Sequence, residues 1–409
     1  MSTEMDLEGF RRQARAWLLH NMELKTGLPT PSDAEDRQLQ AKIADAGYAG
    51  LPYPVEYGGR GLTLRHQEVF HEEAAPYRLP AGLGVSLGMI APTLLDCAAP
   101  EFLADHMPKI LRGEEKWIQL LSEPNAGSDL AGSLTKADRD GDRWIVNGSK
   151  VWSTAAAVAD YGFCLTRTDF DRPKHRGLSV FAMPLRAPGV TINVIVKSDG
   201  CDDEFYEEFF SDVALPADSL IGELNDGWSV AQRLLFHERN FSGGVGYAVG
   251  LRPKTRESVS IDDLITAVRT RGTSLNDHEE DLLAQVYINA LVHNQLSRRV
   301  SSGYTTGSLN GPWGSLLKLS SGLKEHRRAE IAVELCGPAA VTWSDGSDNG
   351  PVGSSWLNAM VMSVAGGSNE MQRNTISEKL LGLPREPALD RDISFRESLR
   401  RRTPGGQEP

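Results

Sequence analysis

Apolar residues recur every three or four positions near the start of the chain, at Leu7, Phe10, Ala14, Trp17 and Leu18. This spacing places them on one face of an α-helix. Ser32 is expected to cap a second helix, because acidic residues follow it, and Gly47 is expected to end that helix. Proline and glycine exclude regular structure from residues 50 to 61, and helical spacing returns between about 64 and 112. Residues 1–116 are therefore predicted to form a helical domain.

The pattern changes to alternation near Trp117. Short alternating runs between residues 133 and 154 are separated by Asp140-Gly141 and Asn147-Gly148. Asn-Gly between alternating runs predicts a β-hairpin, because both turn residues need positive φ. Further strands are predicted at Tyr161–Arg167, Leu178–Pro184, Val190–Val196 and Glu208–Leu215. Regular short strands with turns between them predict a β-sandwich or barrel domain over residues 117–226.

Helical periodicity returns after Gly227 and persists. Helices are predicted at Trp228–Glu238, Ile261–Arg269, His278–Val300, Trp313–Cys336 and Ser368–Leu381. Long helices in succession predict a bundle over residues 227–389. The Arg-rich tail, residues 390–409, contains glycine and proline and is expected to be flexible. The predicted order is α, then β, then an α-helical bundle.

The composition is that of a globular protein, and it argues against several classes of binding partner. The 409 residues include 43 Lys+Arg and 55 Asp+Glu, so the net charge is −12 and non-specific nucleic-acid binding is not expected. Cys97, Cys164, Cys201 and Cys336 are widely spaced, which favours reduced thiols over disulfides or a zinc site. No metal site and no membrane span are expected. The N-terminus is acidic where a signal peptide would be basic, which favours a cytoplasmic location.

Two short segments could carry chemistry. Residues 117–129 begin as an apolar strand and end in a turn with Ser122, Gly127 and Ser128, whose hydroxyl and N–H donors suit a phosphate or the edge of a ring. Trp152, followed by two hydroxyl residues, could line a flat heterocycle. Taken alone, the first segment could be a plain strand-to-loop connection. The second could be a core tryptophan beside two hydroxyls at a strand edge.

In their order, these and five further motifs resemble the acyl-CoA dehydrogenase family over residues 1–386. The motifs are Gly50-Leu-Pro with Tyr57-Gly-Gly-Arg-Gly61, Ser122-Glu-Pro-Asn-Ala-Gly-Ser-Asp129, Asn147-Gly148 with Trp152-Ser-Thr154, Val213-Ala-Leu-Pro216, Asn225-Asp-Gly-Trp228, Glu238-Arg239 and Gly366-Gly-Ser-Asn-Glu-Met-Gln-Arg373. The resemblance implies an α-helical domain, a β domain and a C-terminal four-helix bundle. It also implies FAD as cofactor and an acyl-CoA substrate.

The resemblance carries over a set of cofactor-binding positions. They are Leu121, Ser122, Gly127, Ser128, Trp152, Ser153, Thr154, Glu334, Gly337, Ser368 and Glu370. Ser128 would also contact the acyl-CoA, as would Arg239, which lies beside the expected base. Glu370 is a mild misfit, since it adds a negative charge near a diphosphate.

The reaction needs a base that removes the proton α to the thioester carbonyl. Many family members place a glutamate just before the C-terminal motif, but this chain has Gly366 there. Others, such as isovaleryl- and long-chain acyl-CoA dehydrogenases, place it before an arginine on an earlier helix. Glu238 precedes Arg239 in that way and is the expected base. Gly366 could supply its backbone N–H to the thioester oxygen. The alternative for Glu238 is a surface carboxylate paired with Arg233 or Arg239.

The chain also departs from the family pattern. The Arg-x-x-Phe-Gly segment of most relatives is missing from residues 251–264, and Glu334-Leu-Cys-Gly337-Pro338 replaces Gln-x-x-Gly-Gly. Residues 343–360 are expected to form an extra loop. These departures resemble actinobacterial sterol side-chain acyl-CoA dehydrogenases, some of which pair unlike subunits.

Three hypotheses follow from these departures. In the first, the chain is a complete acyl-CoA dehydrogenase. In the second, it is the partner subunit of a hetero-oligomer and its own site is incomplete. In the third, it is an acyl-carrier-protein dehydrogenase of secondary metabolism. A homo- or hetero-oligomer, either dimer or tetramer, is expected. An electron-transferring flavoprotein is the electron acceptor that the family implies.

Overall fold

The computed structural model describes residues 6–26, 28–29, 31–198, 205–244, 246–248, 261–270, 274–342, 350–388 and 390–402. Its first part is helical, with α1 (Leu7–Asn21), α2 (Asp33–Asp45), α3 (Leu64–Ala74), α4 (Ala91–Cys97) and α5 (Pro100–Arg112). Ser32 caps α2 as predicted: it forms a capping box with Glu35, whose carboxylate accepts from the Ser32 N–H at 2.8 Å. A turn of π-helix, Ser86–Ile90, leads into α4.

The middle of the chain forms an eight-stranded sheet. Its strands are β1 (Trp117–Leu120), β2 (Lys136–Asp140), β3 (Arg143–Thr154), β4 (Tyr161–Arg167), β5 (Leu178–Pro184), β6 (Val190–Ile195), β7 (Phe205–Pro216) and β8 (Leu220–Ile221). The order is β6-β7-β3-β2-β4-β5-β8, and β1 pairs in parallel with β4. The predicted strands are confirmed. Cys201 lies outside the described residues, while Cys97, Cys164 and Cys336 form no disulfide with one another.

The hairpin predicted at Asn147-Gly148 is wrong. A turn does occur at Gly141, between β2 and β3, but β3 continues through Asn147 and Gly148 with a bulge in its pairing to β7. Gly148 has φ 145°, and a Cβ there would lie 2.6 Å from the Thr135 backbone. Asn147 exchanges hydrogen bonds with Asp212 across the strands. Asn147 and Gly148 instead form a β-bulge. Like a turn, a bulge needs unusual backbone angles, and here it also brings the Gly148 backbone close to Thr135.

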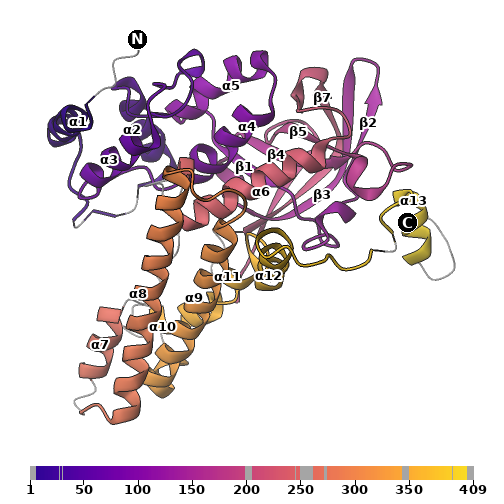
Figure 1. Ribbon diagram of the computed structural model, residues 1–409. Helices are drawn as coiled ribbons and strands as arrows, with labels where there is room; N and C mark the ends of the chain where they lie inside the picture. The colour runs from indigo at the N-terminus through magenta and orange to yellow at the C-terminus, as the bar shows by residue number, and fades with distance from the viewer. Residues whose placement is uncertain are drawn as a thin grey trace.

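The last part of the chain is again helical. Its helices are α6 (Gly227–Gly243), α7 (Ile261–Thr270), α8 (Asp277–Thr305), α9 (Gly314–Cys336), α10 (Gly350–Asn358), α11 (Val361–Val364), α12 (Asn369–Thr375) and α13 (Phe395–Arg402). In Figure 1, α7 to α10 form an arm that projects from the body of the molecule. The expected loop is wrong for α10, where Val352 packs against α9. Residues 343–349 lie outside the described residues.

The expected flexible tail is also wrong for residues 395–402. Phe395 is fully buried, its N–H donates to Arg172 O at 2.8 Å, and its ring lies 4.0 Å from the Arg167 guanidinium carbon. These contacts attach α13 to the β domain, beside which it lies in Figure 1. Residues 403–409 lie outside the described residues.

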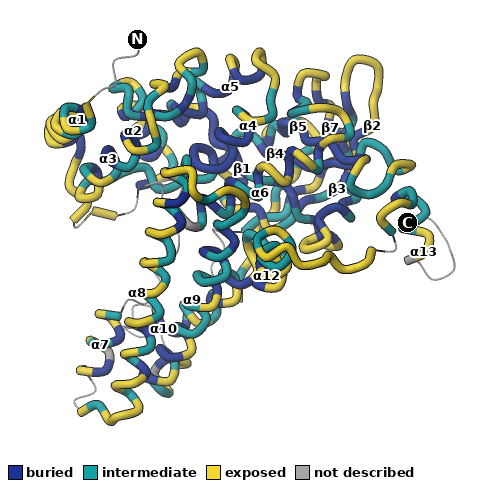
Figure 2. Tube along the Cα trace, in the orientation of Figure 1, coloured by how far each residue is buried: buried dark blue, intermediate teal, exposed yellow. Residues whose placement is uncertain are grey.

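The main core lies where the helical parts meet the sheet. Buried positions gather around α4, α6, β1 and β4 in Figure 2, and include Leu94, Trp117, Phe163 and Leu234. A second cluster, with Trp144, fills the far face of the β domain.

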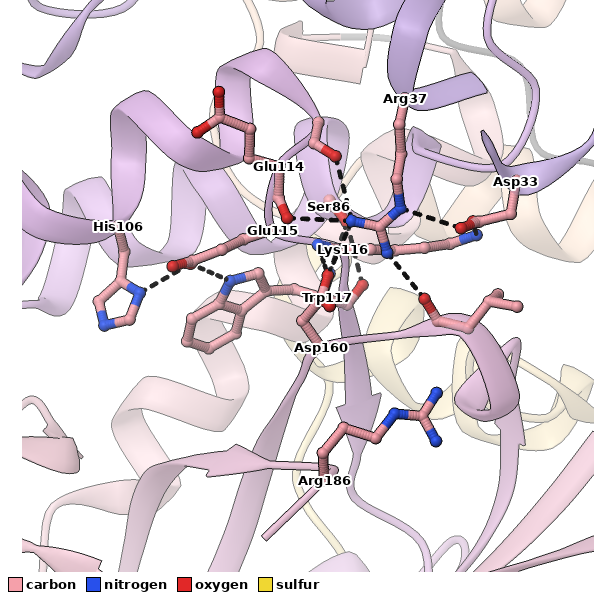
Figure 3. Close-up of polar contacts among 12 residues, drawn as sticks. Asp33, Arg37, Ser86, His106, Glu114, Glu115, Lys116, Trp117, Asp160 and Arg186 are labelled. Atoms are coloured by element: carbon pink, nitrogen blue, oxygen red, sulfur yellow. Dashed lines mark hydrogen bonds and ion pairs between the residues drawn. The ribbon is translucent and has the colours of Figure 1, made fainter. Parts of the chain in front are cut away.

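A polar network joins the N-terminal helices to the start of β1 (Figure 3). Arg37 of α2 donates to Asp160 at 2.9 Å, and Lys116 donates to Asp33 at 2.6 Å. Glu115 accepts from the Trp117 indole at 3.0 Å. These contacts hold the strand that leads to Ser122 at its entrance to the sheet.

Candidate active site

Glu238 lies on α6 and is 8% exposed. Its Oε1 accepts a hydrogen bond from the Gln119 amide of β1 at 3.1 Å. Burial raises the pKa of Glu238 above its usual range, and the Gln119 hydrogen bond and the charges of Arg239 and Lys318 oppose this only in part. Arg233 is paired with Asp96 instead. Glu238 is therefore not a surface carboxylate, but an enclosed one with raised proton affinity.

Gly366 lies directly against this carboxylate. It has φ 71°, and a Cβ on it would lie 3.5 Å from Glu238 Oε1 and 3.2 Å from Lys318 Cε. Gln372 donates to the carbonyls of Gly366 and Gly367 at 3.1 and 3.0 Å. Among the described residues, the Gly366 N–H donates to no acceptor. Family members carry the base at one of two positions, which correspond to Glu238 and Gly366 in this chain. In this fold the two positions lie next to each other.

Two cations flank Glu238. Lys318 of α9 is 2% exposed and donates to Met362 O, and burial lowers its pKa although Glu238 opposes this effect. The Arg239 Nε is buried without a hydrogen-bond partner, and burial lowers the pKa of this residue too. Two buried cationic side chains therefore lie close enough to act on the Glu238 carboxylate.

A buried ion pair between Lys150 and Glu123 fixes the turn that follows β1. Lys150 donates to Leu121 O at 2.9 Å and to Glu123 at 2.8 Å. Glu123 also accepts from two backbone N–H groups, which together with Lys150 hold its pKa below its usual value although burial alone would raise it. Ser122 O accepts from Val151 N at 3.0 Å, so the two segments singled out in the sequence lie side by side. Gly127 and Ser128 are exposed, with open space next to Gly127.

Trp152 lies on a bulge at the end of β3. It has φ 67° and remains 59% exposed, although a bulky residue rarely adopts positive φ. Thr154 is also exposed. Ser153 points the other way: it is buried and donates to Glu208 of β7. Only Trp152 and Thr154 of the predicted trio therefore present side chains to the outside.

The remaining predicted cofactor positions divide into two groups. Ser368 caps α12, accepting from Met371 N at 3.3 Å, and lies two residues after Gly366. Glu370 is exposed and forms an ion pair with Arg373 at 3.5 Å. Glu334 instead lies near the far end of α9, where it contacts His278 at 2.7 Å.

That far end is remote from Glu238 within one chain. The start of α9, at Gly314, adjoins the Arg239 backbone. At a rise of about 1.5 Å per residue, Glu334 and Gly337 lie roughly 30 Å further along the helix axis. Within a single chain, these two residues are therefore far from the end of α9 that adjoins Arg239.

The sequence did not single out Gln119, Lys150, Lys318 and Glu208. Gln119 had a usable signal, because it is the polar residue in an otherwise apolar strand. The other three come close to the site only through strand pairing and helix packing that no local pattern encodes.

A flavin dinucleotide fits this part of the surface. Trp152 offers an exposed indole at the edge of the sheet, and Gly127 leaves open space where any other residue would add a side chain. Buried polar atoms without a partner, Gln119 Oε1 and Gln372 Oε1, mark places where a polar ligand can bind.

A helical domain, a β sheet and a second helical region meet around the buried carboxylate of Glu238. The family models of the acyl-CoA dehydrogenase N-terminal, middle and C-terminal domains match residues 6–114, 119–213 and 225–381. The chain belongs to the acyl-CoA dehydrogenase family. It is an oxidoreductase that acts on a CH–CH bond, and its cofactor is FAD.

Relatives are similar over nearly the whole chain. Acyl-CoA dehydrogenase IpdE1 of Mycobacterium tuberculosis is 34% identical over 407 residues, covering 93% of this chain and 99% of the relative. FadE34 of the same organism is 33% identical over 86% of this chain and 47% of its own length. The Tcur3481-Tcur3483 steroid ACAD has a TM-score of 0.74 at 25% identity, covering 93% and 98%. The ChsE4-ChsE5 complex from Mycobacterium tuberculosis has a TM-score of 0.69 at 26% identity, covering 94% and 100%.

Within the described part of the chain, no helix is long and apolar enough to cross a membrane. No cluster of metal-ligating side chains occurs among those residues either.

Proposed function

We propose that this chain removes hydrogen from the α and β carbons of an acyl-CoA thioester, with Glu238 as the base. The observation that carries the proposal is the position of Glu238, enclosed between Gln119, Lys318 and Gly366 with a raised pKa. A carboxylate that holds a proton tightly is a stronger base than a solvated one, and such a base contributes a factor of about 10² to 10⁴ in rate.

Each neighbour of Glu238 has a separate role. Gln119 orients the carboxylate through its amide. The unpaired Gly366 N–H donates to the thioester oxygen and stabilises the charge that develops there as the α-proton leaves. Lys318 and Arg239 stabilise the ionised base before it takes up the proton. When bound, FAD supplies the acceptor for the hydride from the β carbon.

The cofactor would be held by residues of the β domain and by Ser368. Ser122, Ser128 and Thr154 supply hydroxyls, Trp152 supplies a flat surface, and Leu121 supplies an apolar contact. A contact from Ser153 would come from its backbone, because its side chain bonds Glu208.

Glu334 and Gly337 belong to the proposed site only through a second subunit, since one chain leaves them about 30 Å away along α9. Exposed apolar residues on α8 support association: Tyr287, Ile288, Leu291 and Val292 lie on one face. The relatives named as ChsE4-ChsE5 and Tcur3481-Tcur3483 pair two chains, so a hetero-oligomer is the second candidate. In that case this chain could depend on its partner for part of the flavin site. We infer that electrons then pass to an electron-transferring flavoprotein.

The test is an anaerobic screen of acyl-CoA thioesters, straight-chain, branched and steroid-linked, on the purified full-length chain. A complete enzyme should be yellow and lose its flavin absorbance with at least one thioester. A colourless chain that acquires flavin only after mixing with a second subunit would favour the hetero-oligomer. A flavin-loaded chain that bleaches only with acyl-carrier-protein thioesters would assign it to secondary metabolism.

A further inference from the structure

The conformation of Trp152 has two features that are unfavourable in themselves. Its backbone has φ 67°, which a bulky residue rarely adopts, and its side chain is 59% exposed. The ring of Phe205 lies nearly perpendicular to the indole, at a centroid distance of 6.1 Å, and leaves much of the indole uncovered. A strained backbone that keeps a large apolar side chain in solvent persists only where neighbouring contacts hold it there.

The burial pattern of β3 would place Trp152 on the opposite side of the sheet. Trp144, Val146 and Lys150 are buried, so even-numbered positions of this strand face the interior. Continued alternation would bury Trp152 and expose Ser153. The structure shows the reverse, because the pairing of β3 with β7 shifts by one residue just before Ser153. The bulge therefore selects one of two arrangements, which differ in the side chain that faces the interior.

Glu208 of β7 stabilises the arrangement that is observed. Ser153 is 3% exposed, and its hydroxyl donates to Oε1 of Glu208, which is itself fully buried. The other carboxyl oxygen of Glu208, Oε2, has no hydrogen-bond partner in the described part of the chain. Lys150 lies opposite Glu208 across the two strands, but it donates to Leu121 O and to Glu123 at 2.9 and 2.8 Å. The Ser153 hydroxyl is therefore committed to this buried carboxyl.

The hydrogen bond between Ser153 and Glu208 disfavours the alternative arrangement. A buried carboxyl that loses its donor keeps the cost of desolvation and gains nothing in return. If β3 returned to regular alternation, Ser153 would turn outward and Glu208 would lose that donor. Trp152 would at the same time be directed toward the side of the sheet on which Glu208 and Lys150 are buried.

We propose that Glu208 and Ser153 are positioning residues for the flavin: their hydrogen bond keeps Trp152 on the exposed side of the bulge, where the indole can receive the flavin ring. This inference rests on the proposed flavin site, in which Trp152 supplies the flat surface. Glu208 acts through the direction of β3, and its side chain lies behind the surface that the flavin would cover. The apparent affinity for FAD then depends on the fraction of molecules in which Trp152 faces outward.

The first measurement is hydrogen–deuterium exchange of the amides of residues 151–155 in the full-length chain without FAD. Ser153→Ala removes the donor, and Glu208→Leu removes the acceptor while nearly keeping the side-chain volume. Each variant should exchange these amides about two- to tenfold faster than the parent, which is the factor that one net hydrogen bond contributes. Glu208→Gln keeps an acceptor oxygen and should exchange at close to the parent rate.

The second measurement is a titration of the same proteins with FAD, followed by flavin fluorescence. Ser153→Ala and Glu208→Leu should weaken FAD binding by about two- to tenfold, and Glu208→Gln should restore it. The matched control is Thr135→Val, because Thr135 is 1% exposed and donates to Ser149 O at 3.0 Å near the other bulge of β3. This control loses a buried hydrogen bond in the same sheet, yet it should change neither the exchange of residues 151–155 nor the affinity for FAD.

The proposal is overturned if both Ser153→Ala and Glu208→Leu exchange at the parent rate, or if exchange is faster while FAD binds as before. Equal effects of Thr135→Val would indicate a general loss of stability and would overturn it as well. If Glu208→Leu does not fold, Ser153→Ala is a smaller change and decides the comparison. If the parent takes up FAD only with a second subunit, the titration uses that complex.

Bleaching of the flavin by a thioester is scored separately from binding. The expected exchange rates and FAD affinities without any bleaching would refute the proposed function and leave the roles of Glu208 and Ser153 standing. A parent protein that binds no FAD, alone or in a complex, would contradict the flavin site and this proposal together.

Discussion

Replacing Glu238 with Gln is the sharpest test of the proposed base. The variant keeps the side-chain volume and the Oε1 acceptor for Gln119, so the contacts with Gly366 and Lys318 are retained. It removes only the ability to take up a proton. Loss of a general base lowers a rate by about 10² to 10⁴, equivalent to about 3–5 kcal/mol in the barrier. Anaerobic bleaching by a productive thioester should slow by that factor, while FAD content stays unchanged.

The same substitution should stabilise the fold at neutral pH. The pKa of Glu238 is higher in the folded chain than in the unfolded one, so the unfolded state binds fewer protons between the two values. Stability therefore falls as the pH rises above the unfolded value of about 4.5, and the loss is complete once the pH exceeds the folded value. Glutamine carries no charge at any pH and avoids this loss. Urea unfolding at pH 5 and pH 8 should show a larger gain for the variant at pH 8.

A matched control is Glu223→Gln, which changes an exposed carboxylate just before α6. It should alter neither the bleaching rate nor the pH dependence of stability. The reasoning is refuted if Glu238→Gln bleaches at the rate of the parent, or if its stability difference from the parent is the same at both pH values.

Three further substitutions test other parts of the structure. Glu208→Gln should stabilise the fold more at pH 8 than at pH 5, by about 2.5 kcal/mol, because burial raises the pKa of this carboxyl from 4.5 to about 7. Equal shifts of the urea midpoint at both pH values would contradict this expectation. Gly366→Ala should cost about 1–2 kcal/mol in urea unfolding and slow bleaching, since φ is 71° and the new Cβ would crowd Lys318. Phe395→Ala should cost about 3–5 kcal/mol by urea unfolding, and an unchanged midpoint would show that α13 does not pack as described.

Local patterns predicted most of the helices and strands correctly because their signals are short-range. The capping box at Ser32 is complete within four residues, and β4 and β5 are short, largely apolar runs whose side chains are buried on both faces of the sheet. The hairpin prediction at Asn147-Gly148 is wrong because a turn and a bulge favour the same residue types. The pairing of β3 with β7, some sixty residues away, decides between the two.

Sequence could suggest candidate site residues within single segments, but not which of them meet. The choice of Glu238 rests on the family resemblance, through its position before Arg239, and its role as base stays a prediction. Its contact with Gln119 depends on the packing of α6 against the sheet, which no local pattern encodes. The inward direction of Ser153 follows from a bulge that reverses the expected alternation. The expected flexible tail failed because a single aromatic residue, Phe395, finds a buried position on the β domain.

Three distant stretches of sequence converge on the Glu238 carboxylate: Gln119 from the sheet, Lys318 from α9, and Gly366 from the segment that precedes α12. Until α9 and the segment before α12 have folded against α6, the Glu238 carboxylate lacks two of these three neighbours. Part of the burial that raises the pKa of Glu238 therefore depends on the docking of the last helices. If Glu238 is the base, as we propose, a chain truncated before α9 should show no activity toward thioesters.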